Sequence, residues 1–181
     1  MNKFKLIKTV LVILMLFAML FTVSAVEEQD PIPVFATFSY TWSSPMMAQT
    51  SSYIVQHGIE PEVWSGDFEG TADAIWRVGF YSNEPLVDVW LLSEFTGTML
   101  GEYEGTATMI LVGDQPNVAD SPWKTQWYGE WAIIDGTGDL ANVHGHGVWW
   151  GPGNGPNADL ENEVDEIALA GEIVFMEPPS N

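Results

Sequence analysis

The chain has 181 residues, of which 25 are acidic and only five are basic, so its formal net charge at pH 7 is −20. A surface of this charge repels nucleic acids and anionic membranes, which argues against either as a partner, and its simplest role is to keep the protein soluble. The absence of cysteine excludes disulfides and lipid-modified cysteines, so stability has to come from a packed core.

Residues 1–25 are typical of an export signal. Three lysines lie in the first eight residues, an uncharged apolar run follows, and Val23, Ser24 and Ala25 offer the small residues of a cleavage site. The apolar run lacks Gly and Pro, so we expect it to be helical. Cleavage would place the mature protein outside the cell or at the outer side of its envelope; the alternative is an uncleaved helix that anchors the chain in a membrane.

The remaining chain is the right length for one domain that buries its own core. Residues 26–34 are acidic and contain two prolines, which predicts a flexible lead, and residues 178–181 form a short tail. Between them, residues 35–177 are expected to form the domain.

Alternation of apolar and polar residues predicts strands throughout this domain. In residues 68–80, for example, the even positions are aromatic, aliphatic or glycine, whereas most of the odd positions are polar. Residues 43–52 have the composition of a loop, and no segment shows a sustained helical period. The expected strands are residues 35–42, 68–80, 85–99, 101–113, 123–134, a strand after residue 142, and residues 165–175.

A short internal repeat suggests how these strands close. Residues 68–72 (FEGTA) recur as residues 103–107 (YEGTA), and each copy starts a strand with an aromatic residue and a glycine on its inner face. Glycine at this position lets a sheet coil tightly, and about eight strands is the number at which a barrel is just filled or holds one small ligand. The sequence therefore predicts an all-β protein with a single antiparallel closed β-barrel.

Residues 133–147 (IIDGTGDLANVHGHG) predict a tight corner between two strands. Gly136 and Gly138 can adopt the positive φ angles that such a corner requires, and we expect at least one of them to do so. This stretch resembles the GTG-x-L/F-A-G-x-x-G-x-G corner of small barrels in the allene oxide cyclase and dirigent-like group, especially an uncharacterised bacterial family of such barrels. Asn142 stands where that family often has glycine.

The two EGTA strand starts and the last strand extend the resemblance over residues 35–176. It implies an allene oxide cyclase-like or calycin-like antiparallel barrel. It implies no reaction, because none of those enzymes' catalytic residues can be placed on this sequence. No Ser/His/Asp arrangement, phosphate-binding glycine loop or buried carboxylate pair is evident either, so the sequence leaves open whether the protein is an enzyme and predicts no catalytic residue.

The predicted inner face is the first candidate site. Trp76, Tyr103, Trp127 and Trp131 alternate there with glycine and alanine, a mixture that can leave room for a small apolar or aromatic ligand at the barrel mouth. The alternative is that these rings interlock as ordinary core.

Two further groups could hold a metal. His144 and His146 share one strand face at a spacing that suits two ligands of one ion, although no third ligand is evident and two exposed histidines are the simpler interpretation. Asp159, Glu161 and Glu163 follow a flexible loop and could bind calcium, but an acidic run is usually only solvated. No other cofactor is predicted.

Three functional classes follow from these patterns. The first is a secreted barrel that binds a small apolar or aromatic molecule, the second is an isomerase or cyclase, and the third is a surface or matrix protein whose acidity is its function. An inward-facing polar group among the aromatic rings would separate the first two classes, and the third predicts a filled interior.

Overall fold

The computed structural model describes residues 30–41, 46–81, 86–116, 125–153 and 164–176. Among these residues, no helix is long and apolar enough to cross a membrane. The export signal, the first four residues of the predicted lead and the C-terminal tail lie outside the described ranges. The strands are β1 (Ile32–Thr41), β2 (Met46–Gln49), β3 (Tyr53–Gly66), β4 (Phe68–Tyr81), β5 (Leu86–Met99), β6 (Tyr103–Pro116), β7 (Thr125–Gly138), β8 (Val143–Gly153) and β9 (Val164–Phe175).

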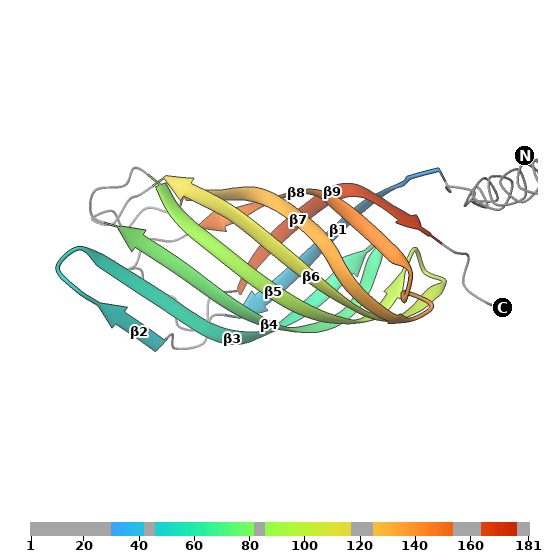
Figure 1. Cartoon of the computed structure of the whole chain (residues 1–181), viewed down its shortest axis with the longest axis horizontal. Helices are drawn as coiled ribbons and strands as arrows, with labels where there is room; N and C mark the ends of the chain where they lie inside the picture. The colour runs from blue at the N-terminus through green and yellow to red at the C-terminus, as the bar shows by residue number, and fades with distance from the viewer. Residues whose placement is uncertain (1–29, 42–45, 82–85, 117–124, 154–163, 177–181) are drawn as a thin grey trace, which may run out of the picture.

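Eight of these strands form a closed antiparallel barrel (Figure 1). From β3 to β9 each strand pairs with the next along the chain, β9 pairs with β1, and β1 pairs with β3 to close the ring. The predicted all-β fold and single closed barrel are confirmed. The barrel starts at Ile32, opposite Ile173 of β9, so the last residues of the segment predicted to be flexible belong to β1.

β2 lies outside the ring. It pairs only with the part of β3 that precedes the β1 contact, and Met46 and Met47 are exposed there. The sequence predicted a loop at residues 43–52. Four of these residues form a strand instead, because the extended start of β3 offers them an unpaired edge.

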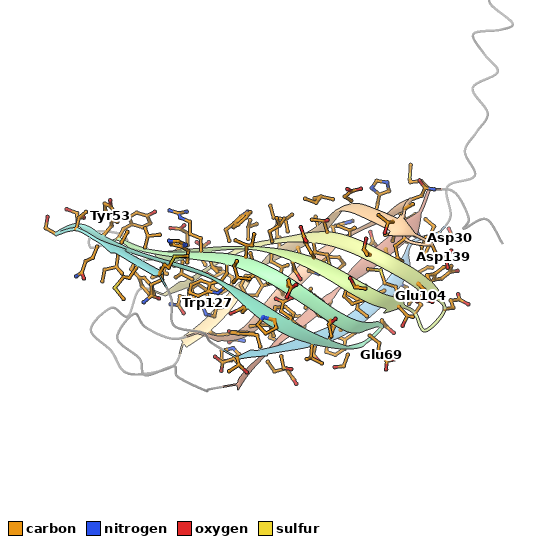
Figure 2. The ribbon with its side chains drawn as sticks, turned by 90° about the horizontal axis from the view of Figure 1, so that it is seen from below. Asp30, Tyr53, Glu69, Glu104, Trp127 and Asp139 are labelled. Carbon is orange, nitrogen blue, oxygen red and sulfur yellow. The ribbon has the colours of Figure 1, made fainter. Side chains whose placement is uncertain are left out.

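The two ends of the barrel differ. At one end, here called the turn end, β3–β4, β5–β6 and β7–β8 are joined by short turns; at the other, the loop end, residues 42–45, 82–85, 117–124 and 154–163 join the strands. Figure 2 shows Glu69, Glu104 and Asp139 at the turn end, with Tyr53 and Trp127 toward the loop end.

Glycines let the strands approach closely at the turn end. Gly70 lies opposite Gly97, which in turn lies opposite Gly105. A Cβ at Gly70 would collide with the carbonyl oxygen of Thr96, and one at Gly105 with that of Thr137. The glycines of the two EGTA sequences, Gly70 and Gly105, therefore belong to the same row of closely approaching strands, with Gly97 between them.

The corner after β7 has the predicted backbone. Gly138 has a φ of +65°, which confirms the expectation of a positive φ. A hydrogen bond from Leu140 N to Thr137 O, 3.1 Å long, closes the turn around it. Gly136 has no positive φ, but a Cβ there would collide with the carbonyl oxygen of Leu140. Each glycine of the corner is thus required for a different reason.

Two alanine substitutions separate the effect of backbone strain at a positive φ from the effect of a close backbone contact at the Cβ position. Gly101 has a φ of +72° with open space around its Cβ position, whereas a Cβ at Gly138 would lie 2.8 Å from the carbonyl oxygen of Glu104. We expect Gly101→Ala to cost about 1 kcal/mol of stability through backbone strain alone, and Gly138→Ala about 2–3 kcal/mol. Urea unfolding measures both. Equal losses would show that the close approach of Glu104 contributes nothing.

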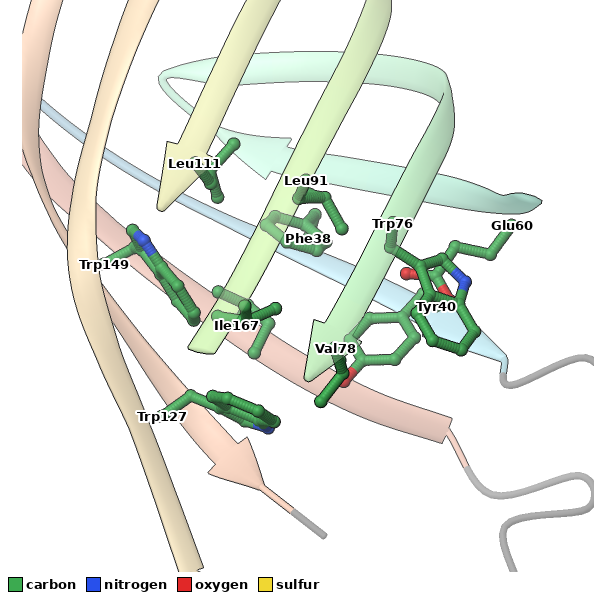
Figure 3. Close-up of a pocket in the computed structure, with 11 residues that line it drawn as sticks. Phe38, Tyr40, Glu60, Trp76, Val78, Leu91, Leu111, Trp127, Trp149 and Ile167 are labelled. Atoms are coloured by element: carbon green, nitrogen blue, oxygen red, sulfur yellow. The ribbon is translucent and has the colours of Figure 1, made fainter. Parts of the chain in front are cut away.

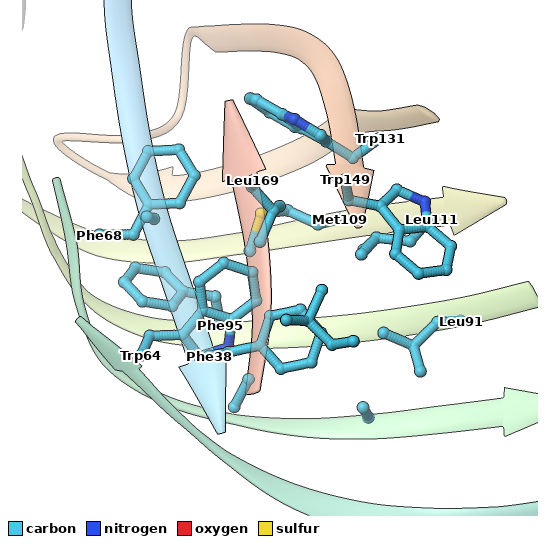
Figure 4. Close-up of a cluster of buried hydrophobic side chains, with 14 of the residues drawn as sticks. Phe38, Trp64, Phe68, Leu91, Phe95, Met109, Leu111, Trp131, Trp149 and Leu169 are labelled. Carbon is cyan, nitrogen blue, oxygen red and sulfur yellow. The ribbon is translucent and has the colours of Figure 1, made fainter. Parts of the chain in front are cut away.

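Large side chains fill the half of the barrel nearest the turn end, here called the turn half. Figure 4 shows them together with Leu91, Leu111 and Trp149, which lie farther toward the loop end. Phe38 stacks on Trp64 with ring centroids 4.7 Å apart, and the rings of Phe68 and Trp131 are nearly perpendicular with centroids 5.9 Å apart. Trp131 lies over glycines of two neighbouring strands, and its Nε1 donates to Ala170 O at 3.2 Å. The glycines beneath it are Gly147 of β8 and Gly171 of β9.

Trp149 of β8 repeats this arrangement in the opposite direction. Its indole lies over Gly129 of β7 and Gly113 of β6, and its Nε1 donates to Val112 O at 3.1 Å. Both indoles therefore lie across the barrel wall with their N–H groups satisfied, as buried tryptophans require.

Candidate functional site

An aromatic cavity lies inside the barrel toward the loop end (Figure 3). The cavity is small, with a volume of about 40 Å³. A space of this volume holds a few waters at most. A larger ligand therefore has to displace wall side chains. Five of these are aromatic: Phe38, Tyr40, Trp76, Trp127 and Trp149.

Small residues beside the rings position this wall. Trp76 of β4 lies against Gly58 of β3, where a Cβ would come within 2.9 Å of its ring. Ala74, two residues before Trp76, is buried on the same inner face. The rings and the small residues beside them thus form one continuous wall on the inner face.

Three carboxyl groups are buried in this half of the barrel. Glu60 is 2% exposed, Glu62 1% and Asp165 3%. Glu60 lines the cavity. Glu62 of β3 and Asp165 of β9 lie on either side of Tyr40 of β1, which also lines the cavity. No buried carboxylate pair was evident from the sequence, and the burial of Glu60 and Glu62 shows that this interpretation was wrong.

The physical reason is an inverted strand pattern in β3. Ile59 and Val63 point outward and are 63% and 59% exposed, while Glu60 and Glu62 between them point inward. Charged residues at alternate positions normally mark the solvent face of a strand. Here they mark the inner face.

Hydrogen bonding of these glutamates is incomplete. Oε2 of Glu62 accepts hydrogen bonds from Trp64 Nε1 at 2.9 Å and from Ser93 Oγ at 2.6 Å. Oε1 of Glu62 and Oε2 of Glu60 are buried and have no hydrogen-bond partner among the described residues. Buried polar atoms without partners destabilise a fold by about 1–3 kcal/mol each, so their presence needs a reason.

Burial also changes the acidity of the pair. Burial raises the pKa of Glu60 from 4.5 to about 9, with further contributions from the negative charges of Glu62 and Asp165. Burial raises the pKa of Glu62 to about 7, although the hydrogen bonds from Ser93 and Trp64 act in the opposite direction. At neutral pH, Glu60 is therefore a protonated acid beside the cavity, and Glu62 is close to its titration midpoint.

The structure brings together two of the four aromatic residues predicted to bind a ligand. Trp76 and Trp127 line the cavity. Tyr103 lies at the turn end with its ring 4.3 Å from that of Phe175, and Trp131 belongs to the filled turn half. Alternation showed correctly that all four face inward. It also placed Trp149 on the inner face, but it did not identify Glu60, Phe38 and Tyr40 as neighbours of Trp76 and Trp127.

The candidate metal ligands are placed apart from this cavity. His144 and His146 are exposed on the outer face of β8, and His146 Nε2 lies 3.7 Å from Glu172 Oε1. Within the described ranges, no three His, Asp or Glu side chains form a group that could hold a metal. The acidic run with Asp159, Glu161 and Glu163 lies outside the described residues.

No protein-family model matches the sequence, and no curated protein matches it. The structure shows an eight-stranded antiparallel closed barrel, and these comparisons assign it to no family.

Proposed function

We propose that this barrel binds a small, mainly apolar or aromatic molecule in the cavity at the loop end. The observation that carries the proposal is a cavity walled by five aromatic rings into which one buried carboxyl group, that of Glu60, projects. Ligand sites in proteins are typically apolar with a few polar groups that fix orientation. If the leader is an export signal, the protein meets this ligand outside the cytoplasm.

The contrast between the two halves of the barrel supports this proposal over simple packing. The turn half is filled by aromatic and aliphatic side chains, whereas the loop half contains three buried carboxyl groups. A leucine or isoleucine at Glu60 or Glu62 would avoid burying polar atoms without partners. A role in recognition explains why these positions carry glutamate.

A barrel enzyme of isomerase or cyclase type is the second candidate, and the two glutamates favour it. Neighbouring carboxyl groups whose pKa values are pushed apart can serve as a general acid and a general base. In this role Glu60 would donate its proton to an oxygen of the substrate, and Glu62 would accept a proton from carbon. Loss of turnover but retention of binding in Glu60→Gln would identify this class.

Tryptophan fluorescence tests the binding proposal. We expect an apolar or aromatic ligand to quench or shift the emission and raise the melting temperature, because it stacks on indoles in the cavity. Trp127→Ala should weaken binding about tenfold with the fold intact. The control is Trp90→Ala, which removes a half-buried indole from outside the cavity.

Two outcomes would count against this proposal. Equal affinity in the Trp127→Ala and wild-type proteins would place the ligand elsewhere. If a broad screen of apolar compounds changes neither the emission nor the melting temperature, the cavity is only a packing defect, and a role for the acidic surface becomes the better hypothesis.

A further inference from the structure

The inner face of the barrel carries acidic side chains but, among the described residues, no basic ones. Glu60, Glu62 and Asp165 face inward, but every basic side chain in the described part of the chain is exposed: Arg77, His57, His144 and His146. Arg77 pairs with Asp88 on the outer surface at 3.5 Å. No basic side chain among the described residues therefore lies inside the barrel beside Glu60 or Glu62.

The surroundings of Glu60 suit a cation. Figure 3 shows its side chain reaching from β3 toward the rings of Trp76 and Tyr40, which line the same cavity. Aromatic faces attract cations, most strongly where water is excluded. Glu60 Oε2 and Glu62 Oε1, which have no hydrogen-bond partner in the described part of the chain, can accept hydrogen bonds when the carboxyl groups are ionised, and an ammonium group carries up to three donors and no acceptor.

We propose that the ligand of this cavity is a cationic amine: a small molecule with an apolar or aromatic body whose protonated nitrogen binds the Glu60 carboxylate beside Tyr40 and Trp76. This inference rests on the proposed function, because it names the ligand class for the same cavity. A neutral ligand with a carbonyl group would accept one hydrogen bond from protonated Glu60. Its carbonyl group would offer no donor to Glu62 Oε1, which has no hydrogen-bond partner among the described residues.

Amine binding is then linked to proton release. The free protein holds a proton on Glu60 below about pH 9, and an ion pair requires that this proton leave. Alkylamines stay protonated up to about pH 10, so their affinity rises with pH between 6 and 9, by at most about tenfold per unit for one proton. An alcohol of the same skeleton shows no such rise.

The groups around Glu60 determine how many protons are released. Glu62 on β3, Asp165 on β9 and Tyr40 on β1 are the titratable neighbours. From β4, Ala74 and Trp76 face this region and carry no titratable group. Glu62 is itself near its midpoint at pH 7, so release of between one and two protons is expected near neutral pH.

Isothermal titration calorimetry of the full chain with the leader removed tests this inference. The probes are primary amines from benzylamine to tryptamine, each compared with the alcohol of the same carbon skeleton, at 150 mM salt and pH 6 to 9. Titrations in two buffers of different ionisation enthalpy report the protons released. We expect amines to bind at least tenfold more tightly than their alcohols at pH 8, with at least one proton released near pH 7.

Two variants locate the effect. Glu60→Gln keeps the size of the side chain and should abolish both the preference for amines and the proton release. Glu94→Gln removes one negative charge from the exposed face of β5 and should change neither, which excludes general attraction to an acidic protein.

The possible failures are distinct. Equal affinity for amines and alcohols, or a preference for amines that survives in Glu60→Gln, would overturn the amine inference and leave the proposed function standing. Binding of apolar compounds in the fluorescence screen without binding of any amine would do the same. If neither set of compounds binds, the proposed function fails as well.

Discussion

Glu60→Gln is expected to stabilise the protein at pH 8 by roughly 3–5 kcal/mol. The folded pKa of this carboxyl group is about 9, whereas its ordinary value is 4.5. The folded state therefore retains a proton that the unfolded state releases. The stability contributed by Glu60 is complete below pH 4.5 and declines by up to about 1.4 kcal/mol per pH unit until the pH passes 9. Glutamine carries no titratable proton and avoids this loss.

Urea unfolding between pH 6 and 9 measures the difference, because exposed carboxyl groups have already ionised below this range. The wild-type protein should lose stability as the pH rises, and Glu60→Gln should show a much shallower decline, due mainly to Glu62. Glu69→Gln, an exposed substitution on β4, should follow the wild-type curve. Parallel curves for Glu60→Gln and the wild type would contradict the raised pKa.

Trp131→Ala is expected to cost about 3–5 kcal/mol of stability. The indole lies over Gly147 and Gly171, is nearly perpendicular to the ring of Phe68 and donates a hydrogen bond to the backbone of β9. Its removal leaves a void bounded by glycine backbone, which has no side chain to fill the space. The carbonyl of Ala170 loses its donor as well.

Trp127→Ala provides the comparison. Trp127 is equally buried, but it lines the existing cavity, so its truncation enlarges a space that is already present. We expect a loss of about 2 kcal/mol or less, measured by the same urea titration. Equal losses at the two positions would mean that the loop half is packed as tightly as the turn half.

Alternation predicted the barrel well because most strands have one apolar face. Even positions of β4 face inward as expected, and the positive φ at Gly138 follows from the corner sequence. β3 is the exception, since its glutamates face inward. The pairing register of β3 with β4 explains which face the glutamates take. Trp64 lies opposite Gly70, so even positions of β3 share the inner face with even positions of β4. A hairpin at Gly66 would have implied this arrangement.

The grouping of the aromatic residues required knowledge that alternation does not contain. Period two assigns a side chain to a face, but its height along the barrel depends on the stagger between strands. Trp127 and Trp131 are four residues apart on one strand and consequently lie in different layers, one in the cavity wall and one in the filled half. Tyr103 is separated from the cavity for the same reason.

The pairing of β1 with β9 makes the barrel a candidate for circular permutation. Ile32 lies opposite Ile173 at the turn end, and directly opposed residues of antiparallel strands have Cα atoms only about 5 Å apart. A short linker could therefore join the first and last strands without disturbing any ladder. New termini placed between β4 and β5 would then lie at the loop end, beside the cavity, where a fused reporter would sense its occupancy.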